Sequence, residues 1–467
     1  MTSIGNYVFN RGLYREIFVG ITILFAISFF TPFSTILNLF LLSWGGILIL
    51  KDLFTERIIF KSKRFIPLII FMFFYFITVV INRNLNLFEN VKIFALTALQ
   101  FFVIFTFDVH DNYDNIKNEM KKFNRIIINM TFVATCISLL VYLFGIGFTI
   151  NGHVVGLENG MLNGIYTGAN TAGPLASISI ILTIINYQFS KRKKLSKFEY
   201  ANIIVQLIFI YTTNSRASLY SMIVFGIIFA LFYFEGAKKK TISVVGVVAV
   251  YYLSKIVNEA VYWLYRGINF IEKVVVYGFR IAKSYITKDG ITPSIDDSII
   301  SNISPGVSGA VEKEINRGFL NGRAQLWECG VKMIKENPWF GVGSRNVYHV
   351  ALKYGDMNSL PGIEGGGMHN IIMQVLVSNG ILGFLALLVF IVPIIFVYLK
   401  YLIDSKLKSH SSKTVLLVSA LLLMLLVHNM VEASILYSAS YMATVFWTYL
   451  GYGLFIMDKD SRGEISD

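Results

Sequence analysis

The chain has 467 residues, of which 55% are hydrophobic and only 15% are charged. A soluble protein usually carries about 25% charged residues. Here the apolar residues are gathered into repeated runs of roughly 17 to 22, the length that spans a bilayer. This pattern excludes an ordinary soluble enzyme, a disordered chain and a disulfide-rich secreted module. It predicts a polytopic membrane protein.

The apolar runs predict an all-α bundle of about twelve transmembrane helices. The expected spans lie near 17–30, 35–50, 66–82, 91–107, 126–147, 170–188, 200–213, 217–234, 241–262, 371–399, 414–430 and 437–457. We expect the first nine helices in 1–253 and one long extracytoplasmic loop in 254–368. The last three helices and a cytoplasmic tail are expected in 369–467. Within the loop, 254–285 has one narrow polar stripe on an apolar helix, which predicts an interfacial helix.

The net charge of +13 follows from basic residues that are placed unevenly along the chain. Most of the 41 Lys and Arg lie in short segments between spans, and these segments alternate so that they fall on the same side of the membrane. The short loops of the other side hold almost none, with Arg83 and Arg216 as the clear cases. Cytoplasmic loops carry this excess of positive charge, so we expect both termini in the cytoplasm and the long loop outside. Because the charges flank membrane spans, they do not predict a nucleic-acid partner.

Several common chemical motifs are missing. No GxxxxGK[ST] run occurs, which argues against an ATP-driven transporter of the P-loop type. Cys136 and Cys329 lack a CxxC neighbour, and no HExxH spacing is present. We therefore expect neither a metal nor another cofactor.

One arginine of the long loop occupies an unusual helical position. The run from Asn321 to Pro338 predicts a helix of about four turns in which Arg323, Trp327 and Gly330 share one face. A cation in the first turn opposes the helix dipole, which prefers carboxylates there. Two interpretations stay open: Arg323 binds an anionic ligand, or it pairs with a nearby carboxylate such as Glu328.

A Gly-rich segment leads into His369 and Asn370, which we expect to open the tenth span. Histidine exchanges protons near neutral pH. At a helix N-terminus the dipole disfavours the imidazolium, which predicts a neutral His369 able to act as a base. The alternative is a structural histidine at the helix entry.

Two further residues stand out on the expected outer face. Arg216 lies in a turn of a few residues between two spans, where an arginine is costly unless it faces a cavity or a partner. This placement favours a functional role. Asn170 begins the sixth span, and we favour helix capping for it.

These segments, in their order along the chain, carry a family resemblance. SRA after a span, then NGRAQLW, ENPWFGVG and HNIIMQVLVSNGILG, around a long outer loop, resemble the O-antigen ligase and polymerase (Wzy-type) superfamily. The GANTAGPLA segment is similar to the family's span entry that contains asparagine. The resemblance implies a GT-C-like membrane bundle. It also implies metal-independent glycosyl transfer from a lipid-linked donor on the outer membrane face.

By motif match, the resemblance also implies roles for individual residues. Arg216 and Arg323 would bind the diphosphate of the donor, and His369 would be the catalytic base. Four more residues are candidates for substrate contact: Asn170, Arg317, Arg345 and Asn370. Arg317 is a near rival of Arg323, because it lies only a short distance upstream.

The favoured function is polymerisation of undecaprenyl-diphosphate-linked oligosaccharide repeat units into O-antigen, capsular polysaccharide or exopolysaccharide at the cytoplasmic membrane. The expected partners are this donor, membrane lipid, a flippase and a chain-length regulator. One alternative is a ligase that transfers the glycan to another acceptor. A second, non-enzymatic alternative is a transporter of a glycolipid or an anion. Charged residues are almost absent from the spans, which argues against a transporter.

Overall fold

The computed structural model describes residues 3–249 and 323–465, apart from isolated positions and 356–359, together with scattered positions between 252 and 267. Arg317 and most of the predicted interfacial helix 254–285 lie outside the described residues. So does the proline-containing segment 286–316 that follows it.

The described residues form fifteen α-helices. They are α1 (Ser3–Val8), α2 (Arg11–Phe25), α3 (Ser34–Lys51), α4 (Ile58–Lys61), α5 (Ile66–Ile81), α6 (Leu87–Leu99), α7 (Tyr113–Leu143), α8 (Ala169–Gln188), α9 (Lys197–Thr212), α10 (Arg216–Phe232), α14 (Arg323–Glu336), α15 (Val347–Ala351), α16 (Ile371–Ser405), α17 (His410–Asn429) and α18 (Tyr441–Ser461). Short 3₁₀ or π turns occupy η1 (Ser28–Phe33), η2 (Asp52–Glu56), η3 (Lys63–Phe65), η4 (Gln100–Ile104) and η5 (Ile363–Gly365).

The prediction of an all-α polytopic membrane protein is confirmed. Each predicted span before residue 235 and after residue 370 contains a helix, and the ninth is helical over 237–249. Among the described residues, seven helical stretches are long and apolar enough to cross a membrane: Ser28–Glu56, Lys63–Ile81, Leu87–Ile104, Tyr113–Leu143, Ala169–Gln188, Ile371–Ser405 and His410–Asn429. The α2, α9 and α10 helices are shorter than these, and α18 is long enough but less apolar.

Local signals explain where several helices begin. Ser196 and Glu199 form a capping box at α9, in which each side chain meets the other residue's backbone N–H. Ser409 caps α17 and Ser440 caps α18, each by accepting a hydrogen bond from a backbone N–H of the first turn. Such caps satisfy backbone groups that a helix start would otherwise leave unpaired.

A small antiparallel sheet between α7 and α8 was not predicted. Its strands β1 (Phe148–Ile150), β2 (His153–Glu158) and β3 (Met161–Gly164) pair in the order β1-β2-β3. The two turns are Asn-Gly pairs at 151–152 and 159–160, all with positive φ. This dipeptide is the sequence signal of a tight β-hairpin.

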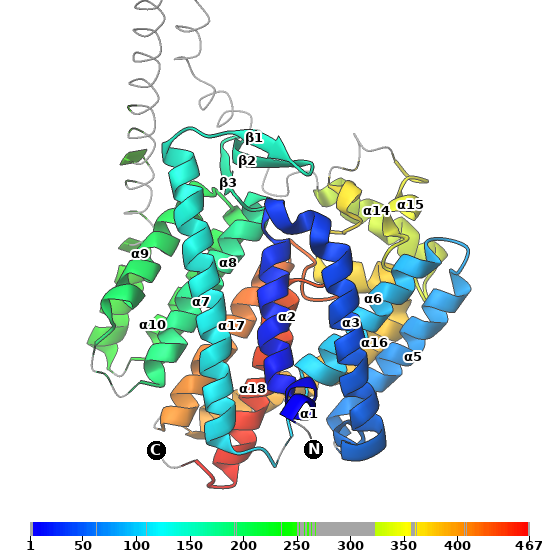
Figure 1. Ribbon diagram of the computed structural model, residues 1–467, viewed down its shortest axis with the longest axis horizontal. Helices are drawn as coiled ribbons and strands as arrows, with labels where there is room; N and C mark the ends of the chain where they lie inside the picture. The colour runs from blue at the N-terminus through cyan, green and yellow to red at the C-terminus, as the bar shows by residue number, and fades with distance from the viewer. Residues whose placement is uncertain are drawn as a thin grey trace, which may run out of the picture.

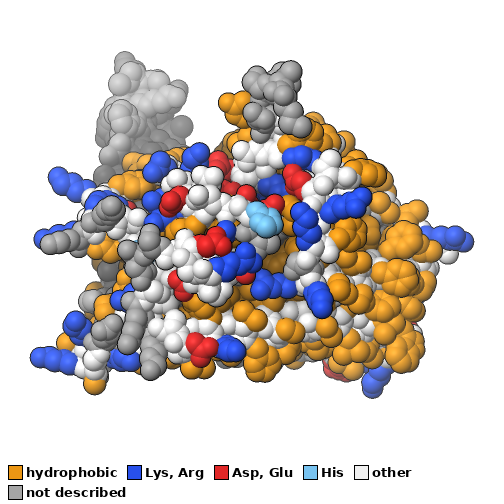
Figure 2. Space-filling model, turned by 90° about the horizontal axis from the view of Figure 1, so that it is seen from below, with side chains coloured by type: hydrophobic (Ala, Val, Ile, Leu, Met, Phe, Trp, Pro, Cys, Tyr) orange, Lys and Arg blue, Asp and Glu red, His pale blue; other side chains and the backbone are white. Residues whose placement is uncertain are grey.

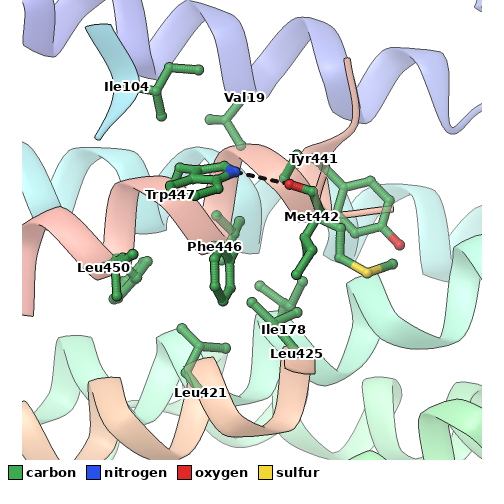
Figure 3. Close-up of a cluster of buried hydrophobic side chains, with 14 of the residues drawn as sticks. Val19, Ile104, Ile178, Leu421, Leu425, Tyr441, Met442, Phe446, Trp447 and Leu450 are labelled. Atoms are coloured by element: carbon green, nitrogen blue, oxygen red, sulfur yellow. Dashed lines mark hydrogen bonds between the residues drawn. The ribbon is translucent and has the colours of Figure 1, made fainter. Parts of the chain in front are cut away.

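The core of the bundle is built around α18. Every residue of α18 from Tyr441 to Met457 is buried, and the indole N–H of Trp447 donates to the carbonyl oxygen of Ile435 at 2.9 Å. Figure 3 shows Val19 and Ile104 on the side of Trp447, and Ile178, Leu421 and Leu425 on the side of the neighbouring Phe446. This packing holds α2, α8 and α17 against α18.

A break inside α16 fixes the segment that follows α14. At Gly380 the backbone leaves the helical region, with φ 64° and ψ −171°. The carbonyl oxygens of Val377 and Ser378 accept hydrogen bonds from the backbone N–H groups of Val342 and Gly343, each at 2.9 Å. The break therefore ties the α14–α15 connection to α16.

The two ends of the bundle differ. Both chain termini lie at one end, whereas the β-sheet, α14 and α15 lie at the other (Figure 1). Figure 2 views the molecule from the end that carries the termini, where many Lys and Arg side chains are gathered. We propose that this end faces the cytoplasm, because basic residues are enriched on that side of membrane proteins.

This orientation predicts the accessibility of single cysteines placed at the two ends. Introduced at Thr149 in β1, a cysteine should react with a membrane-impermeant thiol reagent applied to intact cells. Introduced at Lys194, which precedes α9, it should react only after the membrane is permeabilised. Both positions are exposed. The background protein carries Cys136→Ala and Cys329→Ala. Labelling of residue 194 from outside would reverse the proposed orientation.

The α16 break predicts a large effect for Gly380→Ala. A Cβ at this position would collide with the backbone of Trp339, and a φ of 64° is strained for any residue with a side chain. The free energy of unfolding should fall by about 2 kcal/mol or more. Thermal unfolding in detergent measures this change. Gly46→Ala in α3 is the matched control, because no atom lies within 4 Å of its Cβ position. An equal effect of both substitutions would show that the break has no such role.

Candidate functional site

The site is centred on the carboxylate of Glu432, which lies in the connection between α17 and α18. Its Oε2 is 2.9 Å from Nδ1 of His369, and its Oε1 is 3.1 Å from Nη2 of Arg323. Oε1 also accepts a hydrogen bond from Nδ2 of Asn170 at 3.3 Å. One carboxylate thus joins three of the residues that the sequence singled out.

Arg323 is placed by the packing of α14 against α16. It is the first described residue of α14, and Gly330 on the same helix allows close approach: a Cβ there would lie 2.8 Å from Cε of Met373. The indole N–H of Trp327 donates to the carbonyl oxygen of Met368 at 2.9 Å. This bond connects the arginine-bearing helix to the residue just before His369.

His369 lies two residues before Ile371, which is the first residue of α16 and the start of the expected tenth span. Its φ is 46°, in the left-handed region. Asn370 provides the cap, since its Oδ1 accepts from the backbone N–H groups of Ile372 and Met373. Its Nδ2 donates to the carbonyl oxygen of Met430 at 3.0 Å, two residues before Glu432. Asn370 therefore holds the histidine and the carboxylate in register.

We expected Asn170 to cap α8, and this expectation is wrong. The capping position is Gly168, and Asn170 is the second residue of the helix. Its Oδ1 accepts a hydrogen bond from the Ser215 hydroxyl at 3.0 Å, while its Nδ2 donates to Glu432. Arg216 follows Ser215 as the exposed first residue of α10. The asparagine thereby brings the start of α10 next to the carboxylate.

Arg345 and Glu328, which the sequence also singled out, have contacts outside the Glu432 cluster. The exposed Arg345 lies against the start of α6, where its N–H donates to Oδ1 of Asn90 and its carbonyl oxygen accepts from Asn86. Among the described residues no contact joins it to Glu432. The other anionic partner considered for Arg323 was Glu328, which lies 3.5 Å from Lys332 instead.

The electrostatics of His369 differ from the prediction. The hydrogen bond to Glu432 and the negative charge of that carboxylate raise the pKa of His369, against the opposing effects of burial and of Arg323. The helix dipole had predicted a neutral ring. For Glu432, burial favours the neutral acid, but the hydrogen bond from His369 and the charges of His369, His428 and Arg323 together lower its pKa. The directions of both shifts favour an ionised Glu432 facing the imidazole of His369.

The arrangement combines two chemical capacities. Nδ1 of His369 faces Glu432, which leaves Nε2 as the ring atom that can exchange a proton with a ligand. In this structure Nε2 lies 3.3 Å from the carbonyl oxygen of Gly362. Arg323 offers a planar guanidinium suited to phosphate oxygens. In the part of the chain that the structure describes, no three His, Cys, Asp or Glu side chains are grouped to hold a metal ion.

The sequence reasoning missed the role of Glu432. This carboxylate lies four residues after His428, a fully buried histidine in the last turn of α17. An acid in a short connection between two apolar spans needs a positive partner. The sequence therefore indicated that Glu432 has a positive partner, but it did not identify which residue that partner is.

Comparison with known families agrees with the ordered motifs. Residues 201–388 match the O-antigen ligase family. We refer to this segment, which is similar to that family and covers less than half of the chain, as the matched O-antigen ligase domain. It runs from α9 into α16 and includes Arg216, Arg323 and His369, whereas Asn170 and Glu432 lie outside it. No curated protein matches the chain.

The raised pKa of His369 predicts a pH-dependent stability. A group whose pKa is raised on folding contributes stability that is complete below its unfolded value of about 6.5, and this stability is lost as the pH rises through the folded value. The difference in Tm between the wild type and His369→Gln should therefore be larger at about pH 5.5 than at about pH 8.5. Thermal unfolding at the two pH values measures it.

His349→Gln serves as the control for this measurement, because His349 in α15 contacts the ring of Tyr348 and lies outside the Glu432 cluster. Comparing the two variants separates the effect of the Glu432 contact from the general effect of losing a histidine. An identical difference for His369→Gln at both would show that Glu432 does not stabilise a protonated His369.

Proposed function

We propose that this protein is a membrane-embedded glycosyltransferase that polymerises lipid-diphosphate-linked oligosaccharide repeat units. The supporting observation is the shared carboxylate, which holds an arginine and a histidine together beside the apolar bundle. A phosphate-binding group and a proton-accepting group are what transfer from a glycosyl diphosphate requires.

The reaction follows from the chemistry of such a donor. A hydroxyl oxygen of the acceptor attacks the anomeric carbon, the bond from that carbon to the diphosphate oxygen breaks, and Nε2 of His369 takes the hydroxyl proton. The leaving group is the carrier diphosphate, so no nucleotide is consumed. Arg323 binds its phosphate oxygens, and Arg216 adds a second positive charge from the start of α10. The base contributes a factor of about 10²–10⁴ in rate.

The proposed location is the outer face of the cytoplasmic membrane. The O-antigen ligase domain is flanked by apolar helices, and Arg323 begins α14 at the end of the bundle away from the termini (Figure 1). With the basic end in the cytoplasm, the Glu432 cluster meets a donor that a flippase has delivered to the outer leaflet.

Polymerisation is favoured over ligation because it needs no dedicated second acceptor. The acceptor is another lipid-linked repeat unit, and a chain-length regulator then sets the number of units added. The product is an O-antigen, a capsular polysaccharide or an exopolysaccharide. Transfer to a separate lipid acceptor is the second candidate, and the description of the matched family as O-antigen ligase favours it.

Purified full-length protein in nanodiscs, supplied only with undecaprenyl-diphosphate-linked repeat units, tests the proposal. We expect a ladder of elongated lipid-linked glycans in the presence of EDTA and without ATP, detected by mass spectrometry. His369→Ala should lower the initial rate by about 10²-fold or more while the donor still binds. Arg323→Lys should weaken donor binding, because lysine keeps the charge but loses the planar fork.

Arg83→Lys is the matched control, since Arg83 is an exposed arginine in the turn between α5 and α6. It should elongate glycans at the wild-type rate. Product formed only after addition of a different acceptor would establish a ligase. Movement of the glycolipid across a bilayer without any glycosyl transfer would establish a transporter.

A further inference from the structure

We propose that Glu432 is a positioning residue that couples donor binding to proton transfer. Its carboxylate holds Arg323 in the free enzyme, releases it to the donor diphosphate, and then acts on His369 alone. This inference rests on the proposed function and assigns to the site a residue outside the matched O-antigen ligase domain.

Arg323 and His369 share the Glu432 carboxylate, and a bound ligand can change this sharing. Its two oxygens face different partners: Oε1 meets Arg323 and Asn170, and Oε2 meets His369. The arginine contact is made through Nη2, whereas a guanidinium carries five N–H groups. A diphosphate can therefore approach Arg323 before the contact with Glu432 is broken. The two anions repel each other, which favours complete transfer of Arg323 to the phosphate.

The same carboxylate fixes the histidine. With Nδ1–H donating to Oε2 of Glu432, the ring is held in the form whose Nε2 can accept a proton. In this structure Nε2 faces the carbonyl oxygen of Gly362 at 3.3 Å. A carbonyl oxygen only accepts hydrogen bonds, so this contact suits a ring that carries a proton on Nε2. With Nδ1–H also in place this ring is an imidazolium, so the Nε2 proton must first leave to solvent and the acceptor hydroxyl must replace the Gly362 carbonyl before His369 can act as a base.

The charges around the pair give the coupling its direction. Glu432 raises the pKa of His369, and the positive charge of Arg323 lowers it. Of the other ionisable groups nearby, His428 acts on Glu432 through its charge, and the charge of Glu432 acts on Tyr441. When a diphosphate neutralises Arg323, the lowering effect is removed. His369 then becomes a stronger base at the moment when the donor is in place.

The test is the pH dependence of kcat/KM for Glu432→Gln in nanodiscs, with undecaprenyl-diphosphate-linked repeat units as substrate. Glutamine keeps the shape and a hydrogen-bonding oxygen but loses the charge. We expect kcat to fall about 10²-fold while KM for the donor stays the same or decreases. The acid limb of the profile should move to lower pH by about 1 unit or more, because His369 loses its anionic partner.

Three further variants separate positioning from folding. Glu432→Asp, which restores the charge, should return the acid limb toward its wild-type position. Glu432→Gln in a His369→Ala background should cost no further activity, since the carboxylate acts through the ring. Glu328→Gln, an exposed acid on α14 paired with Lys332, should behave as wild type.

Opposing outcomes are distinguishable. An unmoved acid limb in Glu432→Gln, or independent losses in the double variant, would overturn the coupling while leaving the proposed function intact. Absence of any glycan elongation by the wild-type protein would overturn the proposed function and the coupling together.

Discussion

The site depends on one partly enclosed carboxylate that serves three partners. Only 13% of the Glu432 side chain is exposed, and its contacts come from α8, from α14 and from His369, which precedes α16. An anion in such a place is stable because cationic and hydrogen-bonding groups surround it. The same contacts keep an arginine and a histidine together beside the membrane, where a lone cation would be costly.

This convergence is possible because the bundle holds distant segments in fixed positions. The buried α18 anchors α2, α8 and α17, so the connection that carries Glu432 starts and ends on rigid helices. On the other side, the break at Gly380 clamps the connection after α14 onto α16. Trp327 then ties α14 to Met368, and Asn370 ties the entry of α16 to Met430. Each link is short, although the residues it joins are far apart in sequence.

These distances in sequence explain what could be predicted. The spans were readable because each depends on a local run of apolar residues, and Arg323 and His369 were readable from local motifs. Their shared partner was not, because Glu432 is 63 residues from His369 and 262 from Asn170. Arguments from the helix terminus alone favoured capping by Asn170 and a neutral His369. Both were wrong because such arguments omit Glu432, a carboxylate that the fold brings to these residues. The small β-sheet was missed although its Asn-Gly turns were visible.

The most direct measurement is a cryo-EM structure of the protein in nanodiscs with a non-hydrolysable undecaprenyl diphosphate glycan. The account predicts the diphosphate within hydrogen-bonding distance of the Arg323 guanidinium, the Arg323–Glu432 contact opened, and His369 still paired with Glu432. A donor bound instead at the opposite end would contradict it. A 730 Å³ pocket there is lined by residues that include Arg11, Arg15 and Lys122.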